Sequence, residues 1–339
     1  MSDPSTYRAA NAAAGSMEGP TVDILYIALG LVLLMSGGEL LVRGSVSLAR
    51  RLGVSPLLIG LTLVGFGTST PELITSLQAA LVGSPGIAVG NVVGSNIANI
   101  LLILGLTALI RPLACQPAAF YRDGSMLAGA TLACAAAALG GTLGRVPGAL
   151  FLVLLIAYVV LTYLRERRAP DASAALHEHE ADLAEPAPRS LWLALPFAVG
   201  GIALTILGAR FLVSGAIGFA TAAGISEAVI GLTVVAIGTS LPELVTSVMA
   251  VLRRQGDLAV GNIVGSNIYN LLGILGLTAL VQPLTVPEQI LRLDLWVMLG
   301  VTALLIAFAI TGWRLSRTEG GVLLAGYLMY LGFLAVNVA

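Results

Sequence analysis

A glutamate follows a proline inside the apolar stretch GLTLVGFGTSTPELITS, residues 60–76, at Pro71 and Glu72. The same arrangement recurs in GLTVVAIGTSLPELVTS, residues 231–247, where the acid is Glu243. A charge at the centre of a membrane costs about 2.5–3.5 kcal/mol on insertion scales. Since no Arg lies near either glutamate in the sequence, the pair is predicted to bind a mobile cation.

The prolines predict a break in each of these segments. Proline has no N–H, and its ring clashes with the carbonyl four residues earlier, here that of Gly67 or Gly238. We therefore expect breaks around GFGTSTPE and AIGTSLPE, with freed carbonyls that line a cavity or face protein. Hydroxyl oxygens lie beside them on Thr68, Ser69, Thr239 and Ser240.

A second repeated block supplies further oxygen atoms. It reads GNVVGSNIANILLILGLTALI at residues 90–110 and GNIVGSNIYNLLGILGLTALV at residues 261–281. Ser95 and Asn99 are four residues apart and share a helix face. Ser266 and Asn270 repeat this spacing, and the glycines Gly90, Gly94, Gly261 and Gly265 predict close helix packing. Carboxylate, amide, hydroxyl and carbonyl oxygens without Cys or His suit calcium.

A purely structural interpretation competes with the site. A single proline in a membrane helix is usually a kink, and small-residue spacing is usually packing. The recurrence of both motifs with a glutamate at one offset favours a site. For Glu39, Arg43 and Arg210, near the first span and its equivalent, we expect a structural or interfacial role.

The composition indicates which elements must position these residues. The 339 residues are 57% hydrophobic and 10% charged, with a mean hydropathy of +0.96, whereas soluble domains carry about 25% charged residues. The chain is predicted to be an all-α membrane protein of about ten transmembrane helices in the lipid bilayer. The predicted spans are 23–48, 54–82, 88–110, 124–141, 146–164, 191–216, 226–252, 258–281, 293–312 and 320–338.

The repeats predict two halves of opposite orientation. Residues 60–110 align with 231–281 without a gap at an offset of 171, with about 32 of 51 positions identical. Five spans separate equivalent positions, and five is odd, so the second copy enters the membrane from the other side. The predicted organisation is a polar tail (1–21), a first five-helix repeat (22–165), a linker (166–190) and a second repeat (191–339).

The arginines predict the orientation of the chain. Arg50 and Arg51 precede the second span and Arg253 and Arg254 follow the seventh, while their repeat equivalents carry no charge. Because Lys and Arg favour cytoplasmic loops, we expect a cell (inner) membrane protein with both termini outside and the linker in the cytoplasm. Two arginines, Arg145 and Arg292, fall in predicted outside loops.

Other sequence features exclude several function classes. The formal net charge of −1 gives no indication of a nucleic-acid partner, and Cys115 and Cys134 lack metal or redox spacing. No nucleophile–base set or cofactor motif indicates an enzyme, so no cofactor is expected. A solvated segment is favoured over a regulatory metal site for His177 and His179 in the linker. A cleaved signal peptide is not expected, and Met17 is a possible alternative start.

At these motifs the chain resembles the prokaryotic sodium/calcium exchangers of the cation/calcium exchanger superfamily. The resemblance is carried by GTSTPE with GSNIAN and by GTSLPE with GSNIYN, and it extends from about residue 22 to near the end. It implies a central calcium site and flanking sodium sites, with spans 1 and 6 sliding across spans 2, 3, 7 and 8. The implied set is Gly65, Thr68, Ser69, Glu72, Ser95, Asn99, Ala236, Thr239, Ser240, Glu243, Ser266 and Asn270.

One departure from the family pattern concerns the number of acids. Many members carry an aspartate where this chain has Asn270, so a third carboxylate is absent and the ion stoichiometry stays open. The proton/calcium branch usually has a glutamate shortly after its Gly-Asn pair, whereas Asn91 and Asn262 are followed by VVGS and IVGS. This favours sodium as the coupling ion.

The predicted function is therefore a calcium antiporter driven by sodium. A proton/calcium antiporter, or one for another cation such as magnesium or potassium, is the alternative, and a cation channel is a third reading. The sequence leaves the oligomeric state open, a monomer included.

Overall fold

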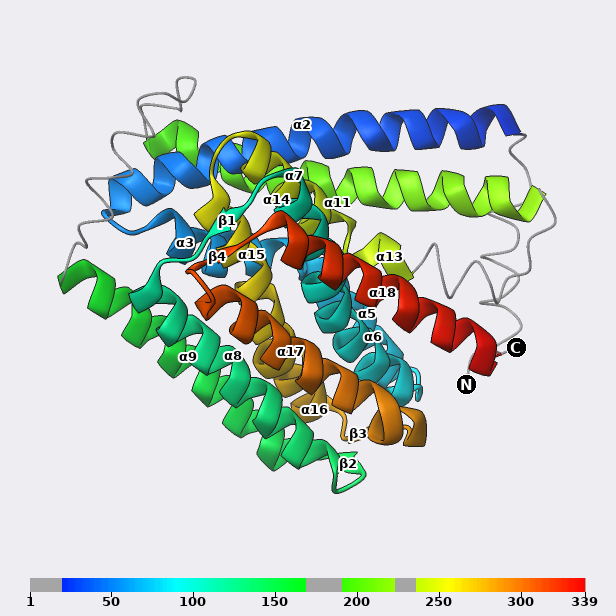
Figure 1. Ribbon diagram of the computed structural model, residues 1–339. Coiled ribbons are helices and arrows are strands. Elements are labelled where there is room, and N and C mark those ends of the chain that lie inside the picture. The colour runs from blue at the N-terminus through cyan, green and yellow to red at the C-terminus, as the bar shows by residue number, and fades with distance from the viewer. Residues whose placement is uncertain (1–19, 169–190, 223–235, 339) are drawn as a thin grey trace.

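The computed structural model describes residues 20–168, 191–222 and 236–338, and these are almost entirely helical (Figure 1). The helices are α2 (Pro20–Leu52), α3 (Pro56–Ile59), α4 (Gly65–Thr68), α5 (Thr70–Leu81), α6 (Pro85–Ala98), α7 (Gly105–Ile110), α8 (Pro117–Ala138), α9 (Arg145–Arg168), α11 (Leu191–Ala222), α13 (Ala236–Thr239), α14 (Leu241–Leu252), α15 (Gly256–Ile268), α16 (Leu275–Val281), α17 (Leu295–Ile310) and α18 (Arg317–Val338). Wider π-helical turns interrupt them at η1 (Gly60–Val64), η2 (Asn99–Leu104), η4 (Tyr269–Ile274) and η5 (Ile290–Asp294).

The all-helical membrane prediction is confirmed at the level of length and composition. Among the described residues, six helices are long and apolar enough to cross a membrane, and a bent pair, 56–68 with 70–81, would make seven. Large apolar side chains of α9, such as Leu150, Val153 and Ile156, are exposed, as a lipid-facing surface requires. The expected ten spans remain a prediction, since part of span 226–252 and the linker with His177 and His179 lie outside the described residues.

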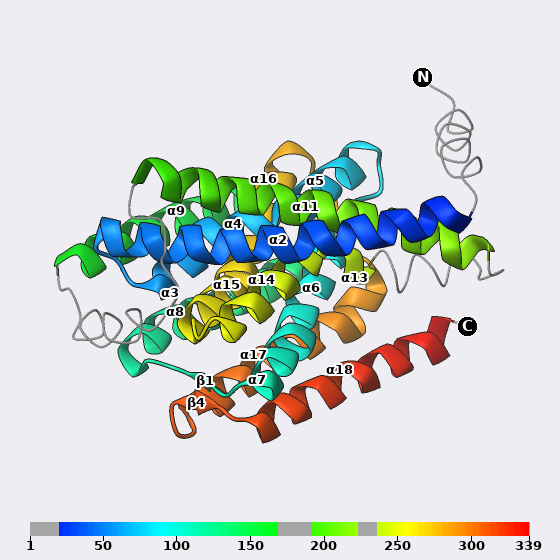
Figure 2. The same ribbon diagram turned by 90° about the horizontal axis from the view of Figure 1, so that it is seen from above.

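Helices α2 and α11 lie side by side on one face of the molecule (Figures 1 and 2). Their backbones approach closely where glycines recur every seven residues: a Cβ added at Gly30 would lie 2.5 Å from Leu212 N, and one at Gly44 would lie 2.4 Å from Ala198 N. As the contact advances 14 residues along α2 it recedes 14 residues along α11, so the two helices run antiparallel. These two helices are equivalent in the sequence repeat.

Close packing also explains two of the glycines in the second block. A Cβ at Gly261 would lie 2.3 Å from Leu57 O, and one at Gly265 would lie 2.1 Å from Leu61 O. No side chain larger than hydrogen fits at these distances without a backbone shift. The close helix packing expected from Gly261 and Gly265 is thus confirmed, and it brings α15 against α3 and η1. The same expectation is wrong for Gly90 and Gly94, because a Cβ at Gly90 would lie 3.9 Å from Ile290 and one at Gly94 would meet nothing within 4 Å.

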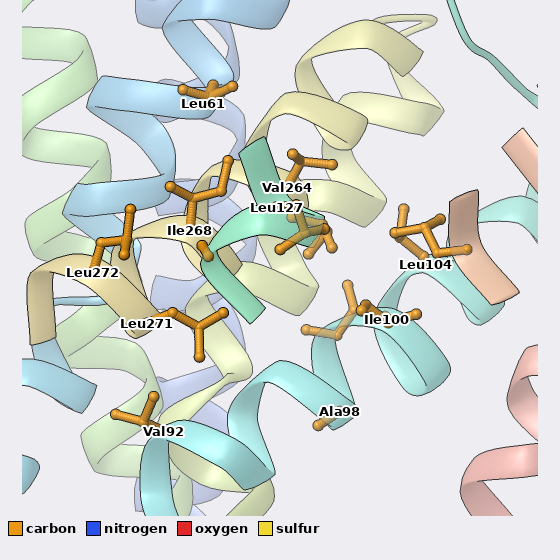
Figure 3. Close-up of a cluster of buried hydrophobic side chains, with 14 of the residues drawn as sticks. Leu61, Val92, Ala98, Ile100, Leu104, Leu127, Val264, Ile268, Leu271 and Leu272 are labelled. Carbon is orange, nitrogen blue, oxygen red and sulfur yellow. The ribbon is translucent and has the colours of Figure 1, made fainter. Parts of the chain in front are cut away.

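A continuous apolar core surrounds these helices. Figure 3 shows part of it, where Leu61 of η1, Leu127 of α8, Ile100 of η2 and Ile268 of α15 converge. All four side chains are at most 1% exposed. The core therefore joins elements of both sequence halves, and neither half buries its apolar surface alone.

Short strands between the helices pair one half of the chain with the other. Strand β1 (Leu113–Ala114) pairs antiparallel with β4 (Arg314–Leu315), and β2 (Thr142–Leu143) pairs antiparallel with β3 (Leu284–Thr285). At the repeat offset of 171 residues β1 is equivalent to β3, and β2 corresponds to β4 with a shift of one residue. The two pairings are therefore reciprocal, as a twofold relation between the halves produces.

Buried acids occur in a second repeated position. Tyr158 Oη donates a hydrogen bond to Asp123 Oδ1 at 2.7 Å, and Tyr330 Oη donates to Asp294 Oδ1 at 2.9 Å. Asp123 and Asp294 are separated by the repeat offset. Both bonds join neighbouring elements, α8 with α9 and η5 with α18, so these acids have a packing role.

The interfacial role expected of Glu39 is confirmed. Glu39, on α2, forms ion pairs with Arg43 one turn later and with Arg253 at the end of α14, where Arg253 Nη2 lies 2.7 Å from Glu39 Oε1. The ion pair with Arg253 links α2, and with it the packed helices α2 and α11, to the end of α14. Arg210, at the position equivalent to Glu39, is exposed.

Candidate cation-binding site

Both predicted helix breaks are present. Helix α4 ends at Thr68 and α5 begins at Thr70, and the segments 56–68 and 70–81 are bent by 44°. In the second copy α13 ends at Thr239 and α14 begins at Leu241. In each break a proline occupies the first turn of the following helix, where its missing N–H disrupts no intrahelical bond.

One detail of the predicted break is wrong. Pro71 was expected to leave the carbonyl of Gly67 without a donor, but Thr70 Oγ1 donates to that oxygen at 2.8 Å. A threonine three residues after the carbonyl can reach back across the turn and replace the missing backbone donor.

The two glutamates lie in these breaks and are fully buried. Glu72 is 0% exposed and Glu243 is 1% exposed. Ser69 Oγ donates to Glu243 Oε1 at 2.7 Å, and Ser240 Oγ donates to Glu72 Oε1 at 3.3 Å. Each carboxylate is therefore held by the serine of the opposite motif, which brings both breaks together at one place.

The other oxygen of each carboxylate has no hydrogen-bond partner among the described residues. The same is true of the amide oxygens of Asn99 and Asn270, which are each 1% exposed. Buried polar atoms are almost always paired, so an unpaired one requires an explanation. Four unpaired oxygens on Glu72, Glu243, Asn99 and Asn270 are therefore suited to a ligand that accepts lone pairs, as a cation does.

The asparagines owe their position to the π-helical turns. Turn η2 begins at Asn99, and turn η4 contains Asn270 as its second residue. A π-helical turn widens a helix locally and re-aims the side chains on it, and such turns are frequent at functional sites. The sequence did not indicate them, since their residues are ordinary helix formers.

The hydroxyl groups of the predicted set have several partners. Ser266 Oγ donates to the carbonyl of Gly65 at 3.2 Å, and Thr68 Oγ1 donates to the carbonyl of Val64 at 3.0 Å. Ser95 is buried on α6, one turn before Asn99. Thr239 and Ala236 belong to the four-residue helix α13, directly before Ser240.

Sequence reasoning missed two asparagines that fix the breaks in place. Asn91 Nδ2 donates to the backbone carbonyl of Glu72 at 3.2 Å and to Ser76 Oγ at 3.0 Å. Asn262 Nδ2 makes the equivalent bonds to the carbonyl of Glu243 at 3.3 Å and to Ser247 Oγ at 2.9 Å. Their repetition in the two Gly-Asn pairs was the signal that could have identified them.

The donor set defines what the site can bind. In the described ranges no group of three or more His, Cys, Asp or Glu side chains is placed so that it could hold a metal ion by itself. Two carboxylates with neutral oxygens around them suit a hard cation, because such ions prefer oxygen ligands.

Comparisons with known proteins agree with this geometry. The family model described as sodium/calcium exchanger protein matches residues 22–164 and 193–336. The chain is 39% identical to the putative antiporter CaxA of Alkalimonas amylolytica over 91% of this chain and 97% of that protein. It is 36% identical to the sodium/calcium exchanger MaX1 of Methanosarcina acetivorans over 92% and 98%, respectively.

A solved structure extends the likeness to the fold. The sodium-calcium exchanger NCX_Mj, soaked with Na⁺ and Sr²⁺, superposes with a TM-score of 0.80 at 32% identity, covering 93% of this chain and 99% of that chain. The family model covers both halves of the sequence, and the relatives match over nearly their whole length. The chain therefore belongs to the sodium/calcium exchanger protein family, whose members are multi-pass membrane transporters.

Proposed function

We propose that the protein is a secondary antiporter that exchanges calcium against sodium across the membrane. The observation that carries this proposal is the set of four buried, unpaired oxygens on Glu72, Glu243, Asn99 and Asn270. Two ionised carboxylates give the empty site a charge near −2, which one calcium ion neutralises. The names of MaX1 and NCX_Mj, both sodium/calcium exchangers, support sodium as the second ion.

The predicted ligand residues take the following roles in this proposal. Calcium lies between Glu72 and Glu243, with carbonyl oxygens from Thr68 and Thr239, and Asn99 and Asn270 complete the centre. Sodium binds in flanking positions. The flanking ligands are the hydroxyls of Ser69, Ser95, Ser240 and Ser266 and the carbonyls of Gly65 and Ala236.

Alternating access follows from the arrangement of the halves. The antiparallel packing of α2 on α11, the reciprocal strand pairs and the reciprocal serine–glutamate bonds support two inverted repeats, 22–165 and 191–339. A site on the axis between inverted repeats can open to either side by exchanging the conformations of the two halves. An exchanger needs this property, whereas a channel does not.

Counterflow distinguishes the antiporter from a channel. Proteoliposomes loaded with sodium are expected to take up calcium-45 from a sodium-free medium, and vesicles loaded with choline instead are expected to take up little. An exchanger requires an ion on the opposite side, because the empty carboxylate pair is costly to move through the membrane. Equal uptake with and without internal sodium or calcium would indicate a channel.

The proposed orientation puts both termini outside and the linker 166–190 in the cytoplasm. It rests on Arg50, Arg51, Arg253 and Arg254, which the inverted arrangement brings to one side of the membrane.

Inversion also makes a labelling prediction. Cysteines introduced at Ser84 and at Gln255, in equivalent loops that are each half-buried, should react with a membrane-impermeant thiol reagent from opposite sides. The two native cysteines should add little labelling, because Cys115 and Cys134 are buried, with exposed fractions of 4% and 1%. Reaction of both positions from the same side would contradict the inverted repeats.

A further inference from the structure

Two asparagines outside the predicted ligand set contact the two asparagines inside it. Asn270 Nδ2 donates to Asn96 Oδ1 at 3.2 Å, and Asn99 Nδ2 donates to Asn267 Oδ1 at 2.9 Å. Asn96 and Asn267 are each 1% exposed and are the Asn of the two Gly-Ser-Asn motifs. Each bond crosses from one half of the chain to the other.

The direction of these hydrogen bonds decides what the site presents to an ion. An amide group has an oxygen end that attracts a cation and an NH₂ end that repels it, and the two ends have almost the same shape. With the NH₂ of Asn99 and of Asn270 engaged, the unpaired end of each is the oxygen. A reversed amide would turn its NH₂ towards the proposed calcium position.

The orientation of the two supporting asparagines is itself fixed, because each donates to an atom that can only accept. Asn267 Nδ2 donates to the backbone carbonyl of Asn96 at 3.3 Å. Asn96 Nδ2 lies 3.9 Å from Met298 Sδ of α17, which is a weak acceptor. Two relays result: one leads from a carbonyl through Asn267 to Asn99, and the other leads from a thioether through Asn96 to Asn270.

We propose that Asn96 and Asn267 are positioning residues that turn the amide oxygens of Asn270 and Asn99 towards the transported cation. The inference rests on the proposed function, because it takes Asn99 and Asn270 as ion ligands. The relay to Asn270 is the weaker of the two, since it ends on sulfur rather than on a carbonyl. A carboxylate at position 270 would need no relay to orient it, because the two oxygens of a carboxylate are equivalent.

This equivalence provides the test. Asn96→Ala removes the acceptor for the Asn270 amide and should raise the calcium concentration for half-maximal exchange about 2- to 10-fold, the range expected for one net hydrogen bond. In an Asn270→Asp background the same substitution should change it by less than about 2-fold, because a carboxylate has no wrong end to present. Exchange is measured as calcium-45 against unlabelled calcium, which requires no sodium.

Asn267→Ala is the matched control, since it removes an equally buried asparagine whose partner is Asn99. Its effect should persist in the Asn270→Asp background. A merely structural role predicts the opposite: both alanine variants would be equally harmful in both backgrounds, and that result would overturn the proposal.

Met298→Leu supplies a variant that preserves volume in case Asn96→Ala does not fold. It removes the sulfur acceptor, so it should raise the half-maximal calcium concentration in the Asn270 protein and leave the Asn270→Asp protein unchanged. An unchanged value in the Asn270 protein would contradict the relay. If the wild type exchanges calcium and the relay variants do so with the same half-maximal calcium concentration, only the positioning role is rejected. If the wild type shows no saturable calcium exchange, the proposed function is rejected as well.

Discussion

Glu72→Gln and Glu243→Gln are each expected to reduce calcium exchange about 100-fold or more while the protein still inserts and purifies. Glutamine keeps the shape of the side chain and can still accept from Ser240 or Ser69, but it removes one of the two charges that would balance calcium in the proposed site. Losing one partner of a buried charge pair costs about 3–5 kcal/mol, and each 1.4 kcal/mol is a factor of ten in affinity.

The effect should be alike in the two variants, because the carboxylates are buried to the same degree and held by reciprocal serine bonds. Calcium-45 uptake per folded transporter is the measurement, with protein folding checked by size exclusion and thermal unfolding. Glu288→Gln is the control, since its side chain is 73% exposed and pairs only at the surface with Arg292. Near-normal uptake by either site variant would remove the shared calcium site.

Much of this site could be predicted from the sequence because the chain carries it twice. One Pro-Glu pair in an apolar segment has several explanations, but two pairs at a constant offset predict both the helix breaks and a common location. The structure places Glu72 and Glu243 together as expected. The cross-pairing of Ser69 and Ser240 is what the proposed twofold relation between the halves would produce, although the sequence alone did not say which serine would face which acid.

The parts that could not be predicted depend on tertiary contacts. The π-helical turns at Asn99 and Asn270 have no local signal, since an extra residue in a helical turn is selected by packing and by the bonds that the site offers. The supporting role of Asn96 depends on a bond to a residue 174 positions away. Thr70, which satisfies the Gly67 carbonyl, is a local feature, and its spacing could have corrected the expected free carbonyl.

The two short strand pairs show a further limit of sequence reasoning. Each strand contains only two residues, too few for an alternating pattern. Their pairing joins a strand of one half to a strand of the other, so it depends on the docking of the halves and not on local propensity. The same docking generates the interface in which both helix breaks meet.

The identity of the coupling ion determines which ion gradient drives calcium uptake. Asn99 and Asn270 do not take up protons at ordinary pH, so in this site only Glu72 and Glu243 could carry coupled protons. The groups around them are hydroxyl and carbonyl oxygens, which suit a singly charged hard cation and offer a proton no acceptor of comparable basicity. On this argument the proposed driving ion is sodium and not the proton.

An outward sodium gradient is therefore expected to drive calcium uptake into vesicles, and a protonophore is expected to leave that uptake largely intact. Each tenfold sodium gradient supplies about 1.4 kcal/mol per coupled ion, so uptake should fall more than about tenfold when the gradient is removed. Calcium-45 accumulation is measured with imposed sodium or proton gradients of equal size. Uptake that follows the pH gradient and ignores sodium would establish the proton antiporter instead.

Asn270→Asp tests the same assignment by changing the protein instead of the ion gradient. A third carboxylate at the centre must be ionised to bind calcium, so protons compete with calcium at three positions instead of two. Calcium exchange by this variant should therefore decline more steeply than that of the wild type as the pH is lowered. The comparison is made between pH profiles scaled to their own maxima, so that a change in the maximal rate does not contribute. Coinciding profiles would mean that the carboxylate at position 270 lies away from the ion, and Asn270 would then lose its place in the site.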